Sequence, residues 1–339
     1  MKIIKNIFFF LSVLLGLFFI GPEVDAPDLE KPIPEIQFSL SQLGDWIDNR
    51  EAKFDNIKPD NASKIEFYDS IPQKTPYSIL YLHGFSASTG EGNPVHRNIA
   101  RALKANIYLP RLSNHGLVEE EPLLNFTGQK YLNSAKEALS MAKKIGEKVI
   151  VISSSTGGTL SLILGDDPQI AALLLFGPNV EIYDSRAALL TLPWGLQIAE
   201  LVLGSKYHIM DKITEEKKNY WTTRYRLEPI IELQKLVETG MKKEIFEKIT
   251  APVFMGYYYK NEEEKDEVVS IPAMLRMYDQ LGTPKEKKQK MIFPEAGDHV
   301  IISHLSTPNH HQVELAALEF LQKQLNVELN LSKPFENQK

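Results

Sequence analysis

The stretch Val149-Ile150-Val151-Ile152-Ser153-Ser154-Ser155-Thr156-Gly157-Gly158 decides the fold. Its four consecutive β-branched apolar residues predict a strand that is buried on both faces, as in a parallel sheet. Small residues then predict a tight turn, and a helix is expected to begin over residues 159–164. A strand, a sharp turn that carries a serine and a helix together form a nucleophile elbow, usually written G-x-S-x-G. Here Ser153 replaces the first glycine, so an ordinary polar turn of three serines stays open as an alternative.

The composition is that of a globular protein with no nucleic-acid partner. The 339 residues suffice for one large α/β domain or two small ones. A hydrophobic content of 43% excludes a disordered chain, and a net charge of -6 disfavours phosphate binding, which needs clustered Lys and Arg. The absence of cysteine excludes disulfides, a thiol nucleophile, a lipid-modified N-terminal cysteine and thiolate zinc sites.

Residues 1–26 predict a secretory signal peptide or an uncleaved membrane anchor. Two lysines precede an almost unbroken apolar run over 7–20, which suits a signal peptide and is short for a membrane-spanning helix. Pro27 would follow a cut after Ala26 and disfavours cleavage there. Either interpretation places the remaining chain outside the cytoplasm, either secreted (or periplasmic) or anchored in the membrane. A buried core helix at the terminus is the third interpretation.

The remainder of the chain alternates strand and helix patterns. Residues 27–60, rich in Pro, Asp, Glu and Asn, predict a loosely packed spacer, and 326–339 predict a polar tail. Between them, strands are expected at 64–68, 78–82, 107–109, 149–152, 170–176, 252–258 and 290–293, and helices at 93–104, 127–145, 159–164, 270–280 and 312–325. This order predicts one α/β domain over 61–325, with a mostly parallel, doubly wound sheet. The stretch 179–247 is too long for a strand–helix connection and predicts an inserted helical cap.

An acid and a histidine follow two later strands, in the order that an elbow serine requires. A serine nucleophile needs a base within hydrogen-bond reach, and the base needs an orienting carboxylate. In open α/β sheets such groups lie in loops at the carboxyl ends of strands. Asp266 follows the strand over 252–258, and His299 follows the strand over 290–293. The order serine, acid, histidine selects Ser155, because Gly157 stands two residues further on.

Other residues compete for these roles. Glu264 and Glu267 flank Asp266 in an acidic run that also fits a solvated face. Asp298 is adjacent to His299 and therefore poorly directed toward the same imidazole. Only His299 lies directly after a strand in a glycine-containing turn, whereas its competitors lie further into the closing segment: His304, His310 and His311.

Two backbone amides are the expected donors to the oxyanion of an acyl-transfer reaction. One belongs to Thr156, which follows the serine, and the other to Phe85, which follows the strand over 78–82. His83, just before this turn, and His115, in a turn further on, are expected to be structural. We expect the apolar stretch 189–203 of the cap to favour an apolar substrate.

Five short motifs resemble those of the α/β-hydrolase superfamily: Leu82-His-Gly-Phe85, Ser113-Asn-His-Gly116, Ser155-x-Gly-Gly158, Asp266-x-Val-Val269 and Gly297-x-His-Val300. Over about residues 61–325 the chain is most similar to monoacylglycerol lipase-like carboxylesterases and serine aminopeptidase-like hydrolases. The resemblance implies Ser155 as nucleophile, Asp266 as orienting acid, His299 as base and a cap that shapes the acyl pocket. Ser153 departs from the elbow pattern of the superfamily.

Two functions of different classes follow from these observations. The first is a serine hydrolase that cleaves small-molecule or lipid esters through an acyl-enzyme, without a metal or an organic cofactor. A peptidase or thioesterase would use the same three residues. The second is a catalytically silent α/β-hydrolase fold that binds a partner at the cell envelope, with membrane contact through the N-terminal segment. The altered elbow and the acidic run before Asp266 motivate it.

Overall fold

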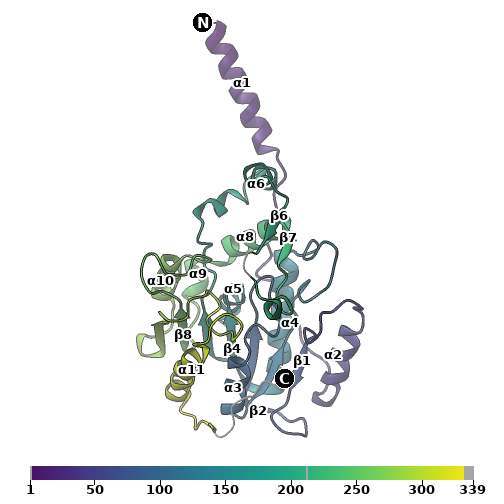
Figure 1. Ribbon diagram of the computed structural model, residues 1–339, viewed down its shortest axis with the longest axis vertical. Helices are drawn as coiled ribbons and strands as arrows, with labels where there is room; N and C mark the ends of the chain where they lie inside the picture. The colour runs from purple at the N-terminus through teal and green to yellow at the C-terminus, as the bar shows by residue number, and fades with distance from the viewer. Residues whose placement is uncertain (1, 211–212, 332–339) are drawn as a thin grey trace.

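The computed structural model describes residues 2–210 and 213–331, which form a seven-stranded sheet with helices on both faces (Figure 1). The strand order is β1-β3-β2-β4-β5-β8-β9, and only the β1–β3 pair is antiparallel. The strands are β1 (Lys64–Glu66), β2 (Thr75–Leu82), β3 (Asn106–Leu109), β4 (Gly146–Ser154), β5 (Ile170–Phe176), β8 (Val253–Tyr257) and β9 (Lys288–Ile292). The doubly wound, mostly parallel sheet predicted from the sequence is confirmed.

Alternate side chains of β4, the central strand of the sheet, face two separate apolar layers. Ile150 and Ile152 pack with α3 (Val95–Ala102) and α11 (His310–Leu325) on one face. Val149 and Val151 face the other layer, which contains α4 (Gly128–Ile145), α5 (Thr156–Ile163) and α10 (Ile271–Gln280). The four consecutive β-branched residues of β4 therefore suit their place, because both faces of the strand are buried there.

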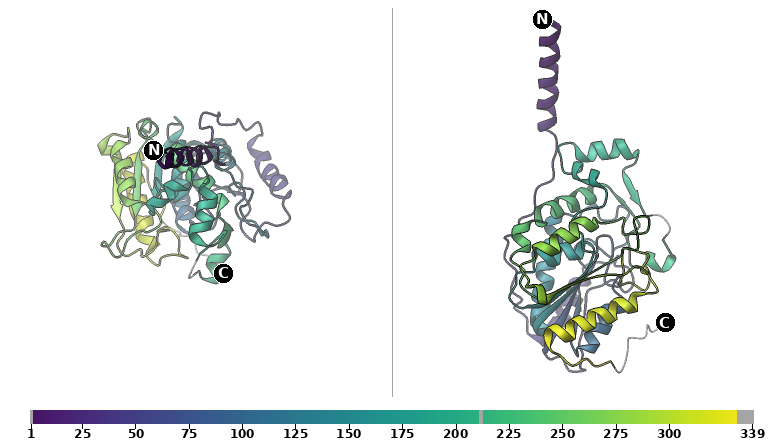
Figure 2. Two further views of the ribbon diagram at one scale, coloured as in Figure 1. Left: turned by 90° about the horizontal axis from the view of Figure 1, so that it is seen from above. Right: turned by 90° about the vertical axis from the view of Figure 1, so that its left-hand side faces the viewer.

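The inserted segment between β5 and β8 lies over the carboxyl end of the sheet (Figure 2). Its helices are η2 (Ser185–Leu189), α6 (Gly195–Leu203), α7 (Glu215–Lys218), α8 (Glu228–Gly240) and α9 (Lys243–Phe246). The segment also contains an antiparallel pair, β6 (Tyr207–Ile209) and β7 (Arg224–Arg226), which the sequence did not predict. Three-residue strands are too short to display a recognisable alternation.

Residues 27–60 pack more closely than a spacer is expected to. They contain η1 (Leu40–Gln42) and α2 (Leu43–Glu51), and the side chains of Leu43 and Ile47 are buried in the main apolar core. Glu51 forms a buried ion pair with Arg111 at 2.6 Å. Two apolar residues four positions apart lie on one face of a helix, so a predominantly polar segment still docks on the domain.

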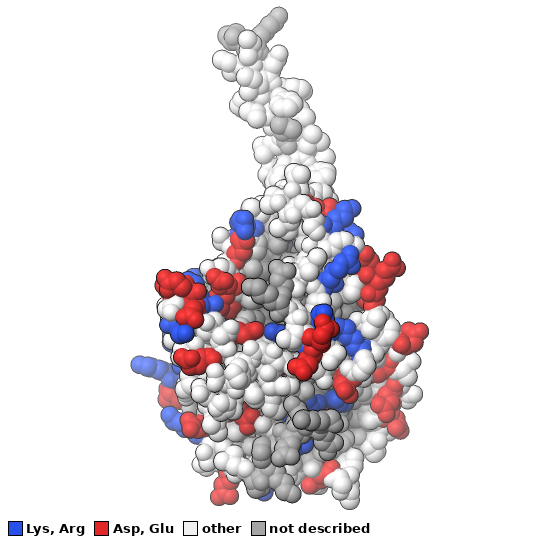
Figure 3. All heavy atoms as spheres, in the orientation of Figure 1, with Lys and Arg blue, Asp and Glu red and all other residues white. Residues whose placement is uncertain are grey.

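The N-terminal helix α1 (Lys2–Phe19) projects away from the globular body, next to the cap (Figures 1 and 2). Its apolar side chains are exposed, which makes the interpretation as a buried core helix wrong. In Figure 3 this helix is almost free of charged atoms, whereas charges are scattered over the body. Trp194 of the cap donates through Nε1 to the carbonyl of Leu17 at 3.1 Å. None of the described helices meets the length and apolarity required of a membrane span.

The chain leaves α11 through Asn326, whose left-handed backbone ends the helix. The amide of Asn330 donates to the carbonyl of Ala102 at 2.8 Å, which ties the following residues to α3. The part of the predicted polar tail that follows position 331 lies outside the described residues.

Candidate active site

Ser155 occupies a sharp turn between β4 and α5. Its backbone angles of φ 52° and ψ -120° lie in a region that side-chain-bearing residues rarely adopt and that costs conformational energy. A Cβ atom at Gly157 would lie 2.0 Å from the carbonyl oxygen of Leu82, and one at Gly158 would lie 2.6 Å from Cβ of Pro178. The turn therefore requires both glycines, and strain at a serine of this kind marks a candidate functional residue.

The two serines before Ser155 are buried within β4 and do not line the cavity above it. Ser153 pairs in register with Leu82 of β2 and Leu175 of β5, and its hydroxyl lies 3.5 Å from the carbonyl oxygen of Leu174. A serine in place of the first elbow glycine is thus accommodated inside the sheet. Of the three serines, only Ser155 faces the cavity.

His299 and Asp266 are brought together by the loops after β9 and β8. Nδ1 of His299 lies 2.6 Å from Oδ2 of Asp266, while Oδ1 of Asp266 accepts from the amides of Val268 and Val269 at 2.8 and 3.2 Å. Burial alone raises the pKa of Asp266, but His299 and these amides outweigh it, so the net shift is downward. Burial likewise lowers the pKa of His299, but the Asp266 carboxylate outweighs it and the net pKa lies above the usual value. The pair is therefore suited to stabilise an imidazolium ion.

The far nitrogen of this imidazole remains available. Nε2 of His299 is buried and has no hydrogen-bond partner in the part of the chain that the structure describes. His299 and Ser155 line the same cavity, together with Asp266. A buried imidazole nitrogen without a partner, beside a strained serine, is the arrangement expected of a base before substrate binds.

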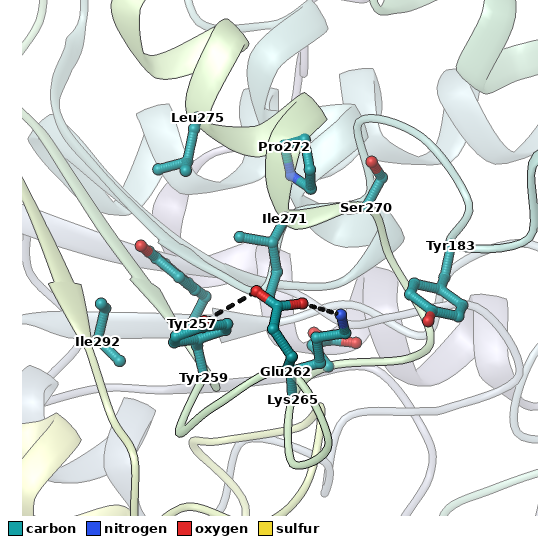
Figure 4. Close-up of a pocket in the computed structure, with 11 residues that line it drawn as sticks. Tyr183, Tyr257, Tyr259, Glu262, Lys265, Ser270, Ile271, Pro272, Leu275 and Ile292 are labelled. Carbon is teal, nitrogen blue, oxygen red and sulfur yellow. Dashed lines mark hydrogen bonds and ion pairs between the residues drawn. The ribbon is translucent and has the colours of Figure 1, made fainter.

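The acidic run before Asp266 forms a small loop whose charges pair with one another. Glu262 accepts from the hydroxyl of Tyr259 at 3.0 Å and from Nζ of Lys265 at 2.5 Å, as the dashed lines of Figure 4 show. Glu264 pairs with Lys260 at 3.1 Å and is exposed, whereas Asp266 is only 2% exposed. The acidic run is thus a solvated face, as one interpretation of the sequence has it, and Asp266 is the residue that turns inward from it.

A second cavity of about 470 Å³ lies beside this loop (Figure 4). Lys265 and Asp266 line both this cavity and the cavity of Ser155. The other lining residues include three tyrosines and several aliphatic side chains: Tyr183, Tyr257, Tyr259, Ile271, Pro272, Leu275 and Ile292.

The other histidines and Asp298 have partners of their own. Nδ1 of His304 lies 2.9 Å from the carbonyl of Asn93, and His310 and His311 each contact a carbonyl within their own turn. Asp298 pairs with Lys217 of the cap at 3.2 Å. Only His299 is joined to a carboxylate in the described residues.

His83 and His115 are held as neutral, structural groups. Nε2 of His83 accepts from the amide of Leu112 at 3.2 Å, and its Nδ1 lies 2.9 Å from the carbonyl oxygen of Gly84. Burial lowers the pKa of His83 to about 4, and burial also lowers the pKa of His115. Neither ring therefore carries a charge at neutral pH.

The cavity above Ser155 has a volume of about 690 Å³. Phe85 and Thr156 line it, and their backbone amides donate to no other group in the described chain, which leaves both for a ligand oxygen. The cap contributes apolar side chains to its walls: Met210, Ile213, Trp221, Tyr225, Ile230 and Leu233. The apolar stretch 189–203 does not line the cavity, contrary to expectation, and the side chains of Leu201 and Val202 are exposed instead.

Glu91 is a residue of the site that the sequence did not predict. Its side chain lines the cavity and accepts hydrogen bonds from the hydroxyl of Tyr81 and the amide of Gly84. The only signal in the sequence is an acid between Gly90 and Gly92 in the loop after a buried strand. Local periodicity does not encode the direction in which such a loop folds, so it does not predict that Glu91 lines the cavity.

No protein-family model and no curated protein sequence matches this chain. Among solved structures, one of the metagenome-derived lipolytic enzymes LipS and LipT matches with a TM-score of 0.61 at 16% identity, over 79% of this chain and 99% of its own. The monoacylglycerol lipase of Paleococcus ferrophilus matches with a TM-score of 0.54 at 13% identity, over 77% and 98%. Est1E of Butyrivibrio proteoclasticus, with ferulic acid bound, matches with a TM-score of 0.51 at 17% identity, over 78% and 95%.

At these identities the likeness establishes the fold. The chain has the α/β-hydrolase fold, with a mostly parallel seven-stranded sheet, and resembles lipases and esterases that share it.

Proposed function

We propose that the protein is a serine hydrolase that cleaves carboxylic esters with an apolar acyl group. One observation carries the proposal. The strained serine of the elbow opens into a cavity that also holds a histidine bonded to a buried carboxylate, in the chain order Ser155, Asp266, His299. This combination of strain, base and acid supports a nucleophile better than a passive binding site.

The proposed reaction proceeds through an acyl-enzyme. Oγ of Ser155 attacks the ester carbonyl carbon while Nε2 of His299 takes the hydroxyl proton, and Asp266 stabilises the imidazolium. The amides of Phe85 and Thr156 hold the oxyanion. His299 gives the proton to the departing alcohol. Water then attacks the acyl carbon, losing a proton to His299, which returns it to Ser155 as the acid departs.

The walls of the cavity support an apolar acyl group. Aromatic and aliphatic side chains from the cap and from the loops dominate its lining, and a volume of about 690 Å³ accepts a medium-length chain. Among proteins of the same fold, structures of a monoacylglycerol lipase and of an esterase with ferulic acid bound are known. A peptidase or a thioesterase would use the same three residues on an amide or a thioester.

The proposal is tested with p-nitrophenyl esters of increasing acyl length and with a matched anilide and thioester. We expect turnover of the esters, with the highest kcat/KM for medium chains. Ser155→Ala and His299→Ala are each expected to lower kcat by at least about 10⁴-fold. A wild-type protein that hydrolyses none of these substrates contradicts the proposal and favours the silent binding fold, for which the test would then be ligand binding.

We further propose that residues 1–26 place the catalytic domain outside the cytoplasm, through a cleaved signal or a retained anchor. The support is the exposed apolar surface of α1, which stands beside exposed apolar residues of α6 (Figures 1 and 2). The test is the intact mass and fractionation of the expressed full chain. Recovery of the uncleaved protein in the cytoplasmic fraction, free of membranes, contradicts the proposal.

A further inference from the structure

Glu91 is a buried carboxyl group that the reaction above leaves without a role. It lies in the loop between β2 and α3 and is 1% exposed. One oxygen, Oε2, accepts from the hydroxyl of Tyr81 at 2.7 Å and from the amide of Gly84 at 2.8 Å. Gly84 directly precedes Phe85, whose amide is the proposed oxyanion donor. Fixing the amide of Gly84 holds the planar peptide unit before it, so that only the two torsions of Gly84 separate a fixed group from the amide of Phe85.

The other oxygen of Glu91 lies on the side of the loop that faces the serine. A Cβ atom built at Gly84 would lie 2.9 Å from Oε1 of Glu91 and 3.2 Å from Cβ of Ser155. Both atoms therefore flank the same face of Gly84, and both residues line the cavity. Within the described residues the hydrogen bonds of Glu91 are made by Oε2, which leaves Oε1 without a hydrogen-bond partner.

We propose that Glu91 is a positioning residue of the ester-cleaving site, which holds the amide of Gly84 so that the amide of Phe85 faces the oxyanion, and that it works as the neutral acid. The inference rests on the proposed function. The neutral form is required by charge: a carboxylate beside Ser155 would repel the oxyanion that forms on the substrate. With Oε2 accepting two donors, the proton of the neutral acid resides on Oε1.

The surroundings of Glu91 extend this neutral form up to about pH 7. Burial raises the pKa of Glu91 to about 7, and the bonds from Gly84 and Tyr81 and the charges of His299 and Lys217 oppose the rise only in part. Lys217 is itself paired with Asp298. The titratable groups that face Glu91, directly or through the Tyr81 ring, come from several elements: Tyr81 on β2, His96 on α3, Tyr131 on α4, Lys217 on α7 and His299 after β9.

The experiment measures kcat and KM of the full-length protein for p-nitrophenyl butyrate from pH 5.5 to 9.5. For Glu91→Ala we expect kcat to fall at least about tenfold with KM within about twofold, because the lost contact acts on the transition state. Glu91→Gln keeps an acceptor oxygen and is neutral at every pH. It should restore kcat to within about threefold of wild type and remove the alkaline decline that wild type shows, at least about fivefold by pH 9.

Tyr81→Phe removes one donor to Oε2 and keeps the ring, so it tests the idea even if Glu91→Ala fails to fold. Loss of this donor raises the pKa of Glu91 and should move the alkaline decline to higher pH. Glu314→Gln is the matched control, since Glu314 is another carboxyl whose pKa burial raises, hydrogen-bonded to Asn98 outside the cavity. Its pH profile should equal that of wild type.

Equal losses in Glu91→Ala and Glu91→Gln with an unchanged pH profile would show a merely structural role and overturn the inference. A wild-type profile without an alkaline decline overturns the requirement for the neutral acid. Both results leave the proposed function standing, because wild type still turns over ester. Absence of any turnover by wild type overturns the proposed function and this inference together.

Discussion

The loops after β2 and after β8 each bury one carboxyl group that lines the cavity of Ser155, yet the surroundings shift the pKa values of the two groups in opposite directions. Asp266, after β8, meets an imidazole that can take up a positive charge, together with two amides, and its pKa is lowered despite burial. Glu91, after β2, meets a phenol and one amide, and burial raises its pKa to about 7. Burial alone therefore does not set the protonation state of a carboxyl group, because the charge that its hydrogen-bond partner can carry also shifts its pKa.

The largest expected effect concerns the acid that stays ionised. Asp266→Asn preserves the shape of the side chain and removes its charge, so the imidazolium loses its stabilising partner. We expect kcat to fall about 10³-fold or more with little change in KM. Glu264→Gln, two residues away in the same acidic loop but exposed, serves as the control and should leave kcat unchanged. Similar kcat values for Asp266→Asn and Glu264→Gln would break the comparison.

The two acids should also give opposite dependences of stability on pH. The folded pKa of Glu91 lies above its unfolded value, so the folded state holds a proton that the unfolded state loses, and stability falls as pH rises from about 4.5 to 7. Relative to Glu91→Gln, wild type should lose up to about 3 kcal/mol of unfolding free energy over this range. Urea unfolding of both proteins at pH 5 and pH 8 measures the difference.

Asp266 provides the contrasting case. Its folded pKa is lowered, so its contribution to stability is present above the unfolded pKa and is lost as pH falls through the folded value. When the unfolding series is extended to pH 3, wild type should lose stability relative to Asp266→Asn as the pH falls below about 4. If the unfolding free energies of Glu91→Gln and Asp266→Asn both change with pH as that of wild type does, the account of the two carboxyl groups is wrong.

The smallest expected effect concerns Lys217, a cation of the cap that lowers the pKa of Glu91. Lys217→Met removes the ion pair with Asp298 and the positive charge that lowers the pKa of Glu91. We expect kcat to change by less than about threefold, with the alkaline decline displaced to higher pH. Lys218→Met, whose ion pair with Glu215 is exposed, is the matched control and should leave the profile in place. A larger effect of Lys218→Met would show that the cap charges do not act through Glu91.

The sequence predicts Asp266 as a residue of the site but does not predict Glu91. Ser155 directly follows β4, and Asp266 and His299 lie in the loops that follow β8 and β9. Parallel strands bring their carboxyl ends to one edge of the sheet, so the strand order predicts that these three residues lie near one another. Glu91 lies seven residues beyond Gly84, in a loop whose path depends on contacts with the cap, such as the bond from Ser88 to the carbonyl of Tyr220. No periodicity encodes such contacts.

Two further differences from the expectations have related causes. Residues 27–60 dock through Leu43 and Ile47, a pattern too short to stand out in a polar segment. The cap was expected to present 189–203 to the substrate, but its wall comes from residues 208–233. The apolar character of a segment does not specify which surface of the protein the segment contacts.

The central claim is that Ser155 is the nucleophile, and a fluorophosphonate probe tests it most directly. Intact mass spectrometry of the full-length protein reports covalent labelling of a serine activated by a base, whatever the natural substrate. Ser154→Ala is the matched control, since Ser154 is the buried neighbour within β4. We predict one adduct on wild type and on Ser154→Ala, and none on Ser155→Ala. An adduct that persists on Ser155→Ala, or a wild-type protein that takes no label, would contradict the claim.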